Sequence, residues 1–446
     1  MHLILLSGGS GKRLWPLSND VRSKQFLKLL KNDQDEMESM VQRVYRQLKE
    51  VGLSKSVTVV AGSSQRDQII SQLGSSVNSV IEPDRRDTFP AIALACSYLY
   101  SEMKIDREEK IAILPVDPYV HNDYFKSIFE LKGILDENDS ELALLGAEPT
   151  YPSSKYGYII PHESESKVSK VDYFKEKPSE EAASELLKQG ALWNCGVFGF
   201  KLGYLIELLE KSYGFNNISY QKVYDQYDKL NKISFDYEVV EKAKNINVIK
   251  YRGMWKDLGT WNTLTEEMEA EEFGNVVTDG NCTNTHVLNE LNIPVVTMGI
   301  ENCVVVASPD GILVAEKSET PKLKDQIKNF SGRPRYEERR WGTYMVIDHT
   351  FHKCGSESLT KKLTLNEGCN ISYQYHNNRS EVWTIVSGEG TLILDDEMKN
   401  VKQGDVIHIQ EGVKHGLKAL TDLEFIEVQL GTPLIEEDIV RLKMEW

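Results

Sequence analysis

Apolar and polar residues alternate along the first 265 positions in two patterns, which together predict an α/β fold. Short aliphatic runs with the length of buried strands occupy 3–6, 57–61, 110–115 and 142–146. Longer stretches with helical spacing of apolar residues occupy 39–50, 64–73, 90–104 and 122–136. Alternation of strands with helices favours a mostly parallel sheet, in which ligands bind beyond the carboxyl ends of the strands.

The pattern changes between residues 266 and 330. Short β-rich segments at 285–288, 294–300 and 304–307 alternate with turns rich in glycine, asparagine and aspartate. This arrangement predicts a small β-solenoid-like connecting region, although no repeat unit is visible. A short helix is expected at 322–327.

A break follows at Ser331-Gly332-Arg333-Pro334, where we expect a linker. Beyond it, glycine-spaced strands with a period of two, such as those within 383–394 and 406–409, indicate an antiparallel β-barrel or jelly roll. The predicted domains are therefore 1–265, 266–330 and 335–446.

Composition limits the classes of function. The 446 residues include 68 acidic and 52 basic side chains, so the formal net charge is −16 and the pI is about 5.2. Because like charges repel, we expect no general binding to nucleic acid or to an anionic membrane, and phosphate sites must be local. This length, with 40% hydrophobic residues, suits two or three packed domains.

The six cysteines are scattered, with no C-x-x-C pair, and we expect them to be reduced thiols. The apolar run at the start is too short for a signal peptide, and no apolar stretch approaches the length of a membrane span. We therefore expect a cytoplasmic protein. The sequence leaves open whether it forms a homo-oligomer.

The most informative segment is LILLSGGSGKRLWPLSNDVRSKQFL at residues 3–27. Its apolar run passes into three glycines and then into three basic residues, namely Gly8, Gly9, Gly11, Lys12, Arg13 and Lys24. Glycines allow the main chain to approach a polyphosphate closely, and basic side chains neutralise its charge. The spacing fits neither a Walker loop nor the dinucleotide fingerprint. The segment predicts a phosphate-binding loop, and the alternative is a glycine-rich turn with a solvated basic pair.

GGSGKRLWPLS followed by KQFL at 24–27 resembles the signature of the sugar-1-phosphate nucleotidylyltransferases, most closely that of the mannose-1-phosphate guanylyltransferases. Later motifs match in the same order, so the resemblance covers nearly the whole chain. It implies a Rossmann-like nucleotidyltransferase sheet for the first domain. It also implies that Arg13 and Lys24 hold the nucleotide phosphates during attack by the sugar phosphate.

Two aspartates are candidates for a magnesium site. Asp117 follows the predicted strand 110–115, and an acid at the carboxyl edge of a strand that faces a phosphate loop is a natural Mg²⁺ ligand. WKDLGT at 255–260 resembles a second family motif, which implies that Asp257 completes the metal site. Considered by itself, Asp117 could equally be a turn residue or a helix N-cap instead of a metal ligand. For Asp257 the alternative to metal binding is a helix cap. The family usually has histidine where this chain has Pro118.

Three motifs between these acids resemble the sugar-binding segments of the family, namely YGYI at 156–159, FKEKP at 174–178 and WNCGVF at 193–198. Their chemistry suits a sugar phosphate, because Glu176 and Asn194 can hydrogen-bond to hydroxyls and Lys177 can pair with the phosphate. Gly157 and Gly196 permit close approach. The alternative for Glu176 and Lys177 is an ordinary solvated charge pair.

EPDRRDTFPAIA at 82–93 resembles the base-binding segment of the family, which implies nucleotide contacts for Glu82, Arg86, Asp87 and Thr88. Two positions depart from the family pattern, since Asp87 replaces asparagine and Phe89 replaces alanine. An aspartate can accept hydrogen bonds from the N1–H and the exocyclic amine of guanine, so GTP stays compatible with this pattern.

The last domain carries a second set of polar residues that fits the two cupin motifs, with Gln374 in place of the first histidine. Strand alternation puts Gln374 and His376 on one face, so these two, Glu381 and His415 can converge on a cation such as Zn²⁺, Co²⁺ or Mn²⁺. QYHNNRSEVW at 374–383 also resembles the signature of type II phosphomannose isomerases. That resemblance implies that Arg379 holds or shuttles charge beside a metal-polarised sugar carbonyl.

Relatives with both activities usually finish with a tail that differs from DIVRLKMEW at 438–446. Three interpretations of the barrel therefore stand: an active isomerase, a metal-binding but inactive barrel, and a purely structural one.

The resemblance as a whole implies a Mg²⁺-dependent enzyme that makes GDP-mannose and pyrophosphate from GTP and mannose-1-phosphate. Interconversion of fructose-6-phosphate and mannose-6-phosphate would be a second activity. Two alternatives remain, namely the same transfer on another sugar or base, and a catalytically silent nucleotide-sugar sensor. Joint retention of Arg13, Lys24, Asp117 and Asp257 argues against the sensor.

Overall fold

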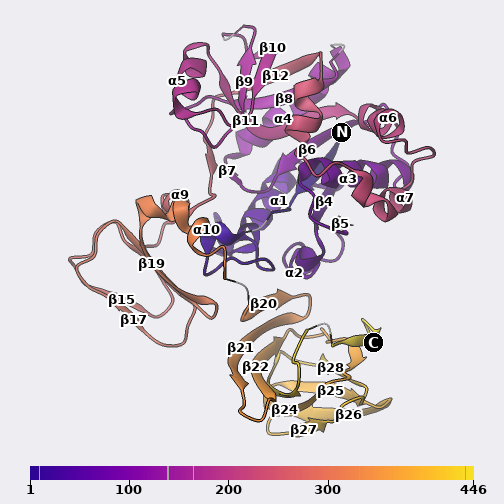
Figure 1. Ribbon diagram of the computed structural model, residues 1–446, viewed down its shortest axis with the longest axis vertical. Coiled ribbons are helices and arrows are strands. Elements are labelled where there is room, and N and C mark those ends of the chain that lie inside the picture. Colours follow the sequence, from indigo (N-terminus) through magenta and orange to yellow (C-terminus); the bar gives the residue numbers. More distant parts are fainter. Residues whose placement is uncertain (10, 138–139, 164, 331, 437) are drawn as a thin grey trace. The chain divides into compact units, whose positions relative to one another are not determined.

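The computed structural model describes residues 1–9, 11–137, 140–163, 165–330, 332–436 and 438–446 (Figure 1). Position 331 of the expected linker lies outside these residues. The chain forms two compact units, one of Met1–Arg13, Ser23–Arg66 and Ser76–Glu269, the other of Leu14–Arg22, Asp67–Ser75 and Ala270–Trp446. Among the described residues, no helix has both the length and the apolar character needed to cross a membrane.

The first unit is organised around a sheet in the order β5-β4-β1-β6-β11-β8-β12-β10-β9. Its strands are β1 (His2–Leu6), β4 (Val57–Gly62), β5 (Asn78–Glu82), β6 (Lys110–Pro115), β8 (Leu142–Ala147), β9 (Tyr158–Pro161), β10 (Val168–Lys175), β11 (Leu192–Lys201) and β12 (Ile246–Tyr251). Neighbours among β5, β4, β1 and β6 are parallel, as are β8 and β12, whereas β11 and β10 run against them. The sheet is therefore mixed. The sequence does not predict these directions, because an apolar run reveals a buried strand but not which way it runs.

Helices cover both faces of this sheet (Figure 1). The helices of the first unit are α1 (Met40–Glu50), α3 (Thr88–Ser101), α4 (Asn122–Glu137), α5 (Glu180–Lys188), α6 (Leu202–Ser212), α7 (Tyr220–Asp225), α8 (Phe235–Glu238) and α9 (Trp261–Thr265), while α2 (Arg66–Leu73) belongs largely to the second unit. Helices α3, α6, α7 and α8 share one core with Ile4 and Ile113, whose side chains point to the same face of the sheet. Helix α1 begins with a capping box between Ser39 and Gln42, which satisfies two backbone donors at its first turn.

The carboxyl ends of the parallel strands gather the predicted site residues at one edge of the sheet. The glycine loop follows β1, Glu82 is the last residue of β5, and Asp117 lies two residues after β6. A short antiparallel ladder then joins β7 (Pro118–Val120) to β13 (Trp255–Asp257), with Asp257 opposite Pro118. This ladder brings Asp257 beside Asp117, although 140 positions of sequence separate them.

In the second unit, short strands follow one another between residues 272 and 316. They are β14 (Glu272–Phe273), β15 (Val276–Thr278), β16 (His286–Asn289), β17 (Val295–Thr297), β18 (Cys303–Ser308) and β19 (Gly311–Glu316), followed by α10 (Leu323–Gln326). Parallel pairs join β14 to β16, β16 to β18 and β15 to β17, and β19 closes the series against β18 in the antiparallel sense. Arg22 of the segment Leu14–Arg22 makes two hydrogen bonds, of 2.8 and 2.9 Å, to the carboxylate of Glu290.

The C-terminal part of the second unit consists of two antiparallel sheets, which we call the C-terminal double sheet. One contains β20 (Tyr336–Arg339), β21 (Gly342–Phe351), β22 (Glu357–Leu365), β24 (Arg379–Ser387), β27 (Val406–Ile409) and β29 (Leu423–Gly431). The other contains β23 (Tyr373–Tyr375), β25 (Glu389–Leu394), β26 (Glu397–Lys402), β28 (His415–Ala419) and β30 (Val440–Lys443). Alternate residues of both sheets, including Leu363, Phe425, Leu392 and Leu417, form one apolar core between them.

Candidate active sites

The glycine loop lies against the segment that carries Lys24. A Cβ atom on Gly11 would lie 2.5 Å from the backbone nitrogen of Lys24 and 2.8 Å from the Cα of Ser23, so only glycine permits this approach. Gly8 and Gly9 line a cavity beside the loop, and Arg13 is exposed next to it. The loop therefore holds Lys24 at the carboxyl edge of the sheet.

Lys24 lies between the two predicted metal ligands. Its Nζ is 2.9 Å from Oδ2 of Asp117 and 3.3 Å from Oδ1 of Asp257. Burial would lower the pKa of Lys24, but attraction from the two carboxylates raises it above the ordinary lysine range. Burial would likewise raise the pKa of Asp117, yet Lys24, with a contribution from Arg13, holds it below its usual value. The two acids thus converge on one cation.

A cavity of about 400 Å³ lies beyond β1, β4 and β5. All four predicted base-binding residues line it, namely Glu82, Arg86, Asp87 and Thr88. Gly8 and Gly9 of the glycine loop also line it, as do Gln65 and Lys232, which the sequence motifs did not indicate. Glu82 is buried, and Tyr227 donates a 2.6 Å hydrogen bond to its Oε1. Burial raises the pKa of Glu82 to about 7.

Asp87 and Arg86 also have structural partners. Asp87 adopts a positive φ of 72° and accepts a 2.7 Å hydrogen bond from the backbone N–H of Thr88, which makes it the N-cap of α3. One guanidinium nitrogen of Arg86 donates to the backbone carbonyls of Asp228 and Leu230, at 3.2 and 3.1 Å. Both residues nevertheless line the cavity, so a contact with a ligand and a structural contact are compatible.

A second cavity, of about 220 Å³, contains both Asp117 and Asp257. Four of the predicted sugar contacts line it, namely Gly157, Glu176, Asn194 and Gly196. A Cβ atom on Gly157 would come within 2.7 Å of the ring of Phe174, so this glycine is required for close packing. The two predicted groups, metal ligands and sugar contacts, therefore share one cavity.

Lys177 differs from the other predicted sugar contacts, because it is not among the described residues that line this cavity. Its ammonium pairs with Glu176, and its side chain is 59% exposed. The pairing with Glu176 matches the solvated charge pair that the sequence left open, while Glu176 itself is almost fully buried.

Asp236 is a residue of this cavity that the sequence motifs did not reveal. Its Oδ1 accepts a 2.7 Å hydrogen bond from the amide of Asn194, whose own oxygen accepts from the backbone N–H of Gly196 at 3.0 Å. Burial, with repulsion from Glu176, raises the pKa of Asp236 to about 6. In the sequence only its place at the start of a short helix marks it, because Ser234 caps α8.

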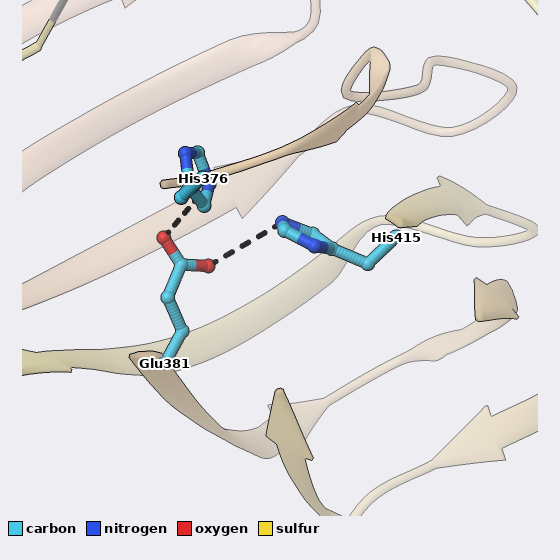
Figure 2. Close-up of side chains that lie close together, drawn as sticks. All are labelled: His376, Glu381 and His415. Carbon is cyan, nitrogen blue, oxygen red and sulfur yellow. Dashed lines mark ion pairs between the residues drawn. The ribbon is translucent and has the colours of Figure 1, made fainter. Parts of the chain in front are cut away.

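The C-terminal double sheet holds a compact group of three predicted metal ligands, His376, Glu381 and His415 (Figure 2). One oxygen of Glu381 lies 3.1 Å from Nε2 of His376, and the other lies 3.6 Å from Nε2 of His415. All three side chains are buried, and their candidate ligand atoms lie within 4.8 Å of one another. The three residues come from β24, β28 and the turn after β23, so only the fold brings them together.

Hydrogen bonds on the far side of each ring orient both histidines. Nδ1 of His376 lies 2.5 Å from the backbone oxygen of Asp438, and Nδ1 of His415 lies 2.9 Å from that of Val413. A proton on each Nδ1 leaves Nε2 with a free lone pair, which is the arrangement that a metal-binding histidine needs. Nε2 of His415 is buried and accepts no hydrogen bond from the described residues, and burial lowers the pKa of this ring.

Gln374 and Arg379 also contact this group. Nε2 of Gln374 lies 3.4 Å from Nε2 of His376, and strand pairing puts Gln374 opposite His415. Arg379 donates a 3.0 Å hydrogen bond to Glu381 and approaches Nε2 of His376 at 3.2 Å. Burial would raise the pKa of Glu381, but its charged neighbours, Arg379 among them, hold it well below the usual range. The residues fit a divalent cation, since two neutral imidazoles and one ionised carboxylate face one point.

Comparison with known proteins supports two functional segments. A family model described as "Nucleotidyl transferase" matches residues 2–273, and one described as "Mannose-6-phosphate isomerase C-terminal" matches residues 332–444. The chain is 31% identical to the xanthan biosynthesis protein XanB of Xanthomonas campestris pv. campestris (strain B100), over 99% of this chain and 97% of the relative. It is 29% identical to a putative mannose-1-phosphate guanylyltransferase of Vibrio cholerae serotype O1, over 99% of both chains.

Among solved structures, that of mannose-1-phosphate geranyltransferase from Thermus thermophilus is similar with a TM-score of 0.60 and 26% identity. The similarity covers 73% of this chain and 98% of that protein. The nucleotidyltransferase fold and a cupin-like C-terminal part therefore account for most of the architecture.

The elevated pKa of Asp236 predicts a pH-dependent gain in stability on its replacement. Its folded pKa of about 6 exceeds the unfolded value of about 3.9, so the contribution of Asp236 to native stability is full below about pH 4 and is lost as the pH rises through 6. We expect Asp236→Asn to raise the free energy of unfolding of the first unit by up to about 3 kcal/mol at pH 8, and by less than half of that at pH 4.5. Urea unfolding at the two pH values measures the difference. The exposed Asp228→Asn is the matched control, and an equal gain at both pH values would contradict the assignment.

Proposed function

Because this chain belongs to the nucleotidyl transferase family and ends in a mannose-6-phosphate isomerase C-terminal segment, we propose that it makes GDP-mannose and pyrophosphate from GTP and mannose-1-phosphate. The alternatives, transfer to another sugar or from another base, use the same chemistry. A silent sensor is disfavoured, because the cation-binding acids and the basic loop are retained together. GTP and the sugar phosphate are the small-molecule partners.

The single observation that carries the proposal is the convergence of Asp117 and Asp257 on the ammonium of Lys24. Two carboxylates that already hold a monovalent cation between them provide the charge and the oxygen donors that Mg²⁺ prefers. When bound there, magnesium would neutralise charge on the nucleotide phosphates. Lys24 would then exchange its carboxylate partners for oxygens of the phosphates that bind at the glycine loop.

In the proposed reaction a phosphate oxygen of mannose-1-phosphate forms a bond to the α-phosphorus of GTP, while the bond from that phosphorus to the pyrophosphate oxygen breaks. Arg13, Lys12 and Lys24 offset negative charge on the phosphates, and the backbone amides of Gly8 and Gly9 provide hydrogen bonds. Glu176, Asn194 and Asp236 bind sugar hydroxyls. Catalysis then consists of positioning and charge stabilisation, with no covalent enzyme intermediate.

The division into domains is part of the proposal. We assign residues 1–265 to the nucleotidyltransferase domain, 266–330 to a β-solenoid-like connection and 335–446 to an antiparallel cupin barrel. The parallel pairs β14–β16–β18 and β15–β17 support the solenoid, and the two antiparallel sheets around one core support the barrel.

The cupin segment is proposed to interconvert fructose-6-phosphate and mannose-6-phosphate. Gln374, His376, Glu381 and His415 would hold Zn²⁺, Co²⁺ or Mn²⁺, which when bound supplies a Lewis acid for the sugar carbonyl. Arg379, which contacts both His376 and Glu381, would stabilise negative charge on the sugar oxygens. The buried, tautomer-fixed histidines favour an active metal site over a purely structural barrel.

Loss of either metal-binding acid should reduce the transferase. We expect Asp117→Asn and Asp257→Asn each to lower GDP-mannose formation at least about a hundredfold at saturating substrates, because each removes one carboxylate from the metal site. Pyrophosphate release from a panel of nucleoside triphosphates and hexose-1-phosphates measures both the activity and its specificity. Exposed Asp33→Asn serves as the control. Near-normal turnover of either variant would remove that aspartate from the metal site.

Asp87 should contribute to the choice of base. Its carboxylate can accept from the two donors of guanine, whereas adenine lacks this donor pair, so we expect Asp87→Ala to reduce the preference for GTP over ATP by roughly 1–3 kcal/mol. The ratio of kcat/KM for the two nucleotides is the measurement. Asp84→Ala, an exposed neighbour, controls for the loss of charge. An unchanged ratio would leave Asp87 with only its role as the N-cap of α3.

The isomerase should depend on the histidine cluster and not on the transferase site. His376→Ala in the full chain should abolish formation of mannose-6-phosphate from fructose-6-phosphate while GDP-mannose synthesis continues. The exposed His408→Ala is the matched control on the same double sheet. If the intact protein forms no mannose-6-phosphate with Zn²⁺, Co²⁺ or Mn²⁺ supplied, the barrel is structural or regulatory.

A further inference from the structure

The C-terminal double sheet contains a cavity of about 330 Å³ next to the histidine cluster. Gln374 and Arg379, which contact His376, form part of its wall, and so does Gln429, whose amide nitrogen lies 3.4 Å from Glu381. The cavity is therefore lined by one proposed metal ligand, Gln374, and by residues that contact two others, His376 and Glu381. Its far wall is formed by side chains that neither the motifs nor the family assignment explains.

The cavity is cationic although the protein is acidic. Five of its lining side chains are basic, namely Arg339, Arg340, Lys361, Arg379 and Arg441. Three are carboxylates, Asp67, Glu427 and Glu436, so the wall has a positive balance in a chain with a net charge of −16. Such a local reversal of charge favours an anionic ligand.

Lys361 is the most deeply buried of these cations apart from Arg379. Strand pairing puts it on β22 opposite Glu427 of β29, and Glu427 is in turn opposite Trp383 of β24. Because side chains alternate along a strand, all three point to the inner face. Only 4% of Lys361 is exposed. A lysine at an inward position of a sheet is rare unless it has a partner.

The partners of Lys361 do not saturate its ammonium. Its Nζ lies 3.8 Å from a carboxylate oxygen of Glu427, 3.7 Å from one of Glu436 and 4.9 Å from the ring centre of Tyr344. The two carboxylate distances exceed hydrogen-bond length, and no described residue accepts a hydrogen bond from this ammonium. Burial lowers the pKa of Lys361, as expected for an ammonium that lacks close acceptors. Three N–H donors therefore remain available to a ligand in the cavity.

Gln429 leaves a complementary acceptor unused. Its amide nitrogen donates to Glu427 at 3.0 Å, while its Oε1 is buried without a donor among the described residues. A buried carbonyl of this kind is costly unless a ligand supplies a hydroxyl or an N–H group. The wall thus offers donors for an anion and an acceptor for a hydroxyl.

We propose that Lys361 is a substrate-binding residue that receives the phosphate of a hexose 6-phosphate, while Gln429 accepts a hydrogen bond from one of its hydroxyls. Two strand spacings separate β22 from β24, roughly 10 Å, which matches the length of a six-carbon sugar phosphate that reaches from the histidine cluster to Lys361. On binding, the ammonium exchanges its distant carboxylates for phosphate oxygens. This inference rests on the proposed isomerase function of the segment.

The experiment is a calorimetric titration of fructose-6-phosphate into the full-length, metal-loaded protein, with GDP-mannose present to fill the transferase site. Lys361→Met should weaken binding roughly 10- to 100-fold, the loss expected for hydrogen bonds to a charged group. Lys362→Met is the matched control, because this neighbour points to the opposite face of β22 and pairs with Glu424 at 2.8 Å. Fructose without phosphate should bind weakly, and equally, to all three proteins.

Kinetics distinguish a binding role from other roles. For Lys361→Met we expect KM for fructose-6-phosphate to rise by a similar factor, with kcat changed less than about threefold and metal content unchanged. Normal affinity with a large fall in kcat would overturn the proposal, because Lys361 would then act at the reacting carbons. Normal affinity with normal kcat would overturn it as well.

Two further comparisons keep the test decisive. If Lys361→Met fails to fold, the charge-balanced double variant Lys361→Met with Glu427→Gln, measured against Glu427→Gln alone, provides the same comparison of affinities. If the wild-type protein binds fructose-6-phosphate through Lys361 but does not isomerise it, the inference stands and the proposed isomerase fails. If the wild-type protein isomerises the sugar and Lys361→Met binds it normally, the inference fails alone.

Discussion

Carboxylates that leave water need a cation nearby, and this electrostatic constraint organises both sites of the protein. Asp117 and Asp257 share Lys24 at the edge of the first sheet, while Glu427 and Glu436 share Lys361 inside the double sheet. A like-charged pair without its cation would carry a desolvation cost of several kcal/mol per ion. Each lysine therefore has a structural role before any ligand arrives.

The same constraint explains why the two lysines differ. Lys24 lies within hydrogen-bond distance of its acids, and attraction raises its pKa, so it lies between the two carboxylates that we propose as Mg²⁺ ligands. Lys361 lies farther from its acids, and burial lowers its pKa. The ammonium of Lys24 already has close carboxylate acceptors, which it must leave before it can bind a phosphate. The ammonium of Lys361 has no acceptor within hydrogen-bond distance among the described residues, so its N–H groups can bind a ligand directly. The ammonium of Lys24 lies 2.9 Å from Asp117, whereas that of Lys361 lies 3.8 Å from Glu427. We therefore expect the two lysines to differ in how readily they bind a phosphate.

The strand arrangement of each sheet determines which other residues lie beside these charge pairs. Parallel strands bring the glycine loop, Glu82 and Asp117 to one edge, and the β7–β13 ladder adds Asp257. Some of the resulting groups are unfavourable for stability, since burial raises the pKa of Glu82 to about 7 and that of Asp236 to about 6. Carboxylates kept at such a cost are typical of positions selected for binding or catalysis.

The sequence by itself determined the elements and most of the chemistry. Apolar periodicity located β4, β6 and β8 within a residue of their bounds, and the glycine loop and cupin spacing indicated residues that the fold brings close together. Local pattern carries this information because hydrophobic burial and close backbone approach act on neighbouring residues.

Only the tertiary structure decided which groups meet. The antiparallel insertion of β11, the placement of Asp236 beside Asn194 and the pairing of Lys361 with Glu427 have no local signature. An isolated aspartate or lysine in a sequence looks the same whether it faces solvent or a cavity. Strand direction, register and long-range pairing set its surroundings, and those depend on contacts between residues far apart in the chain.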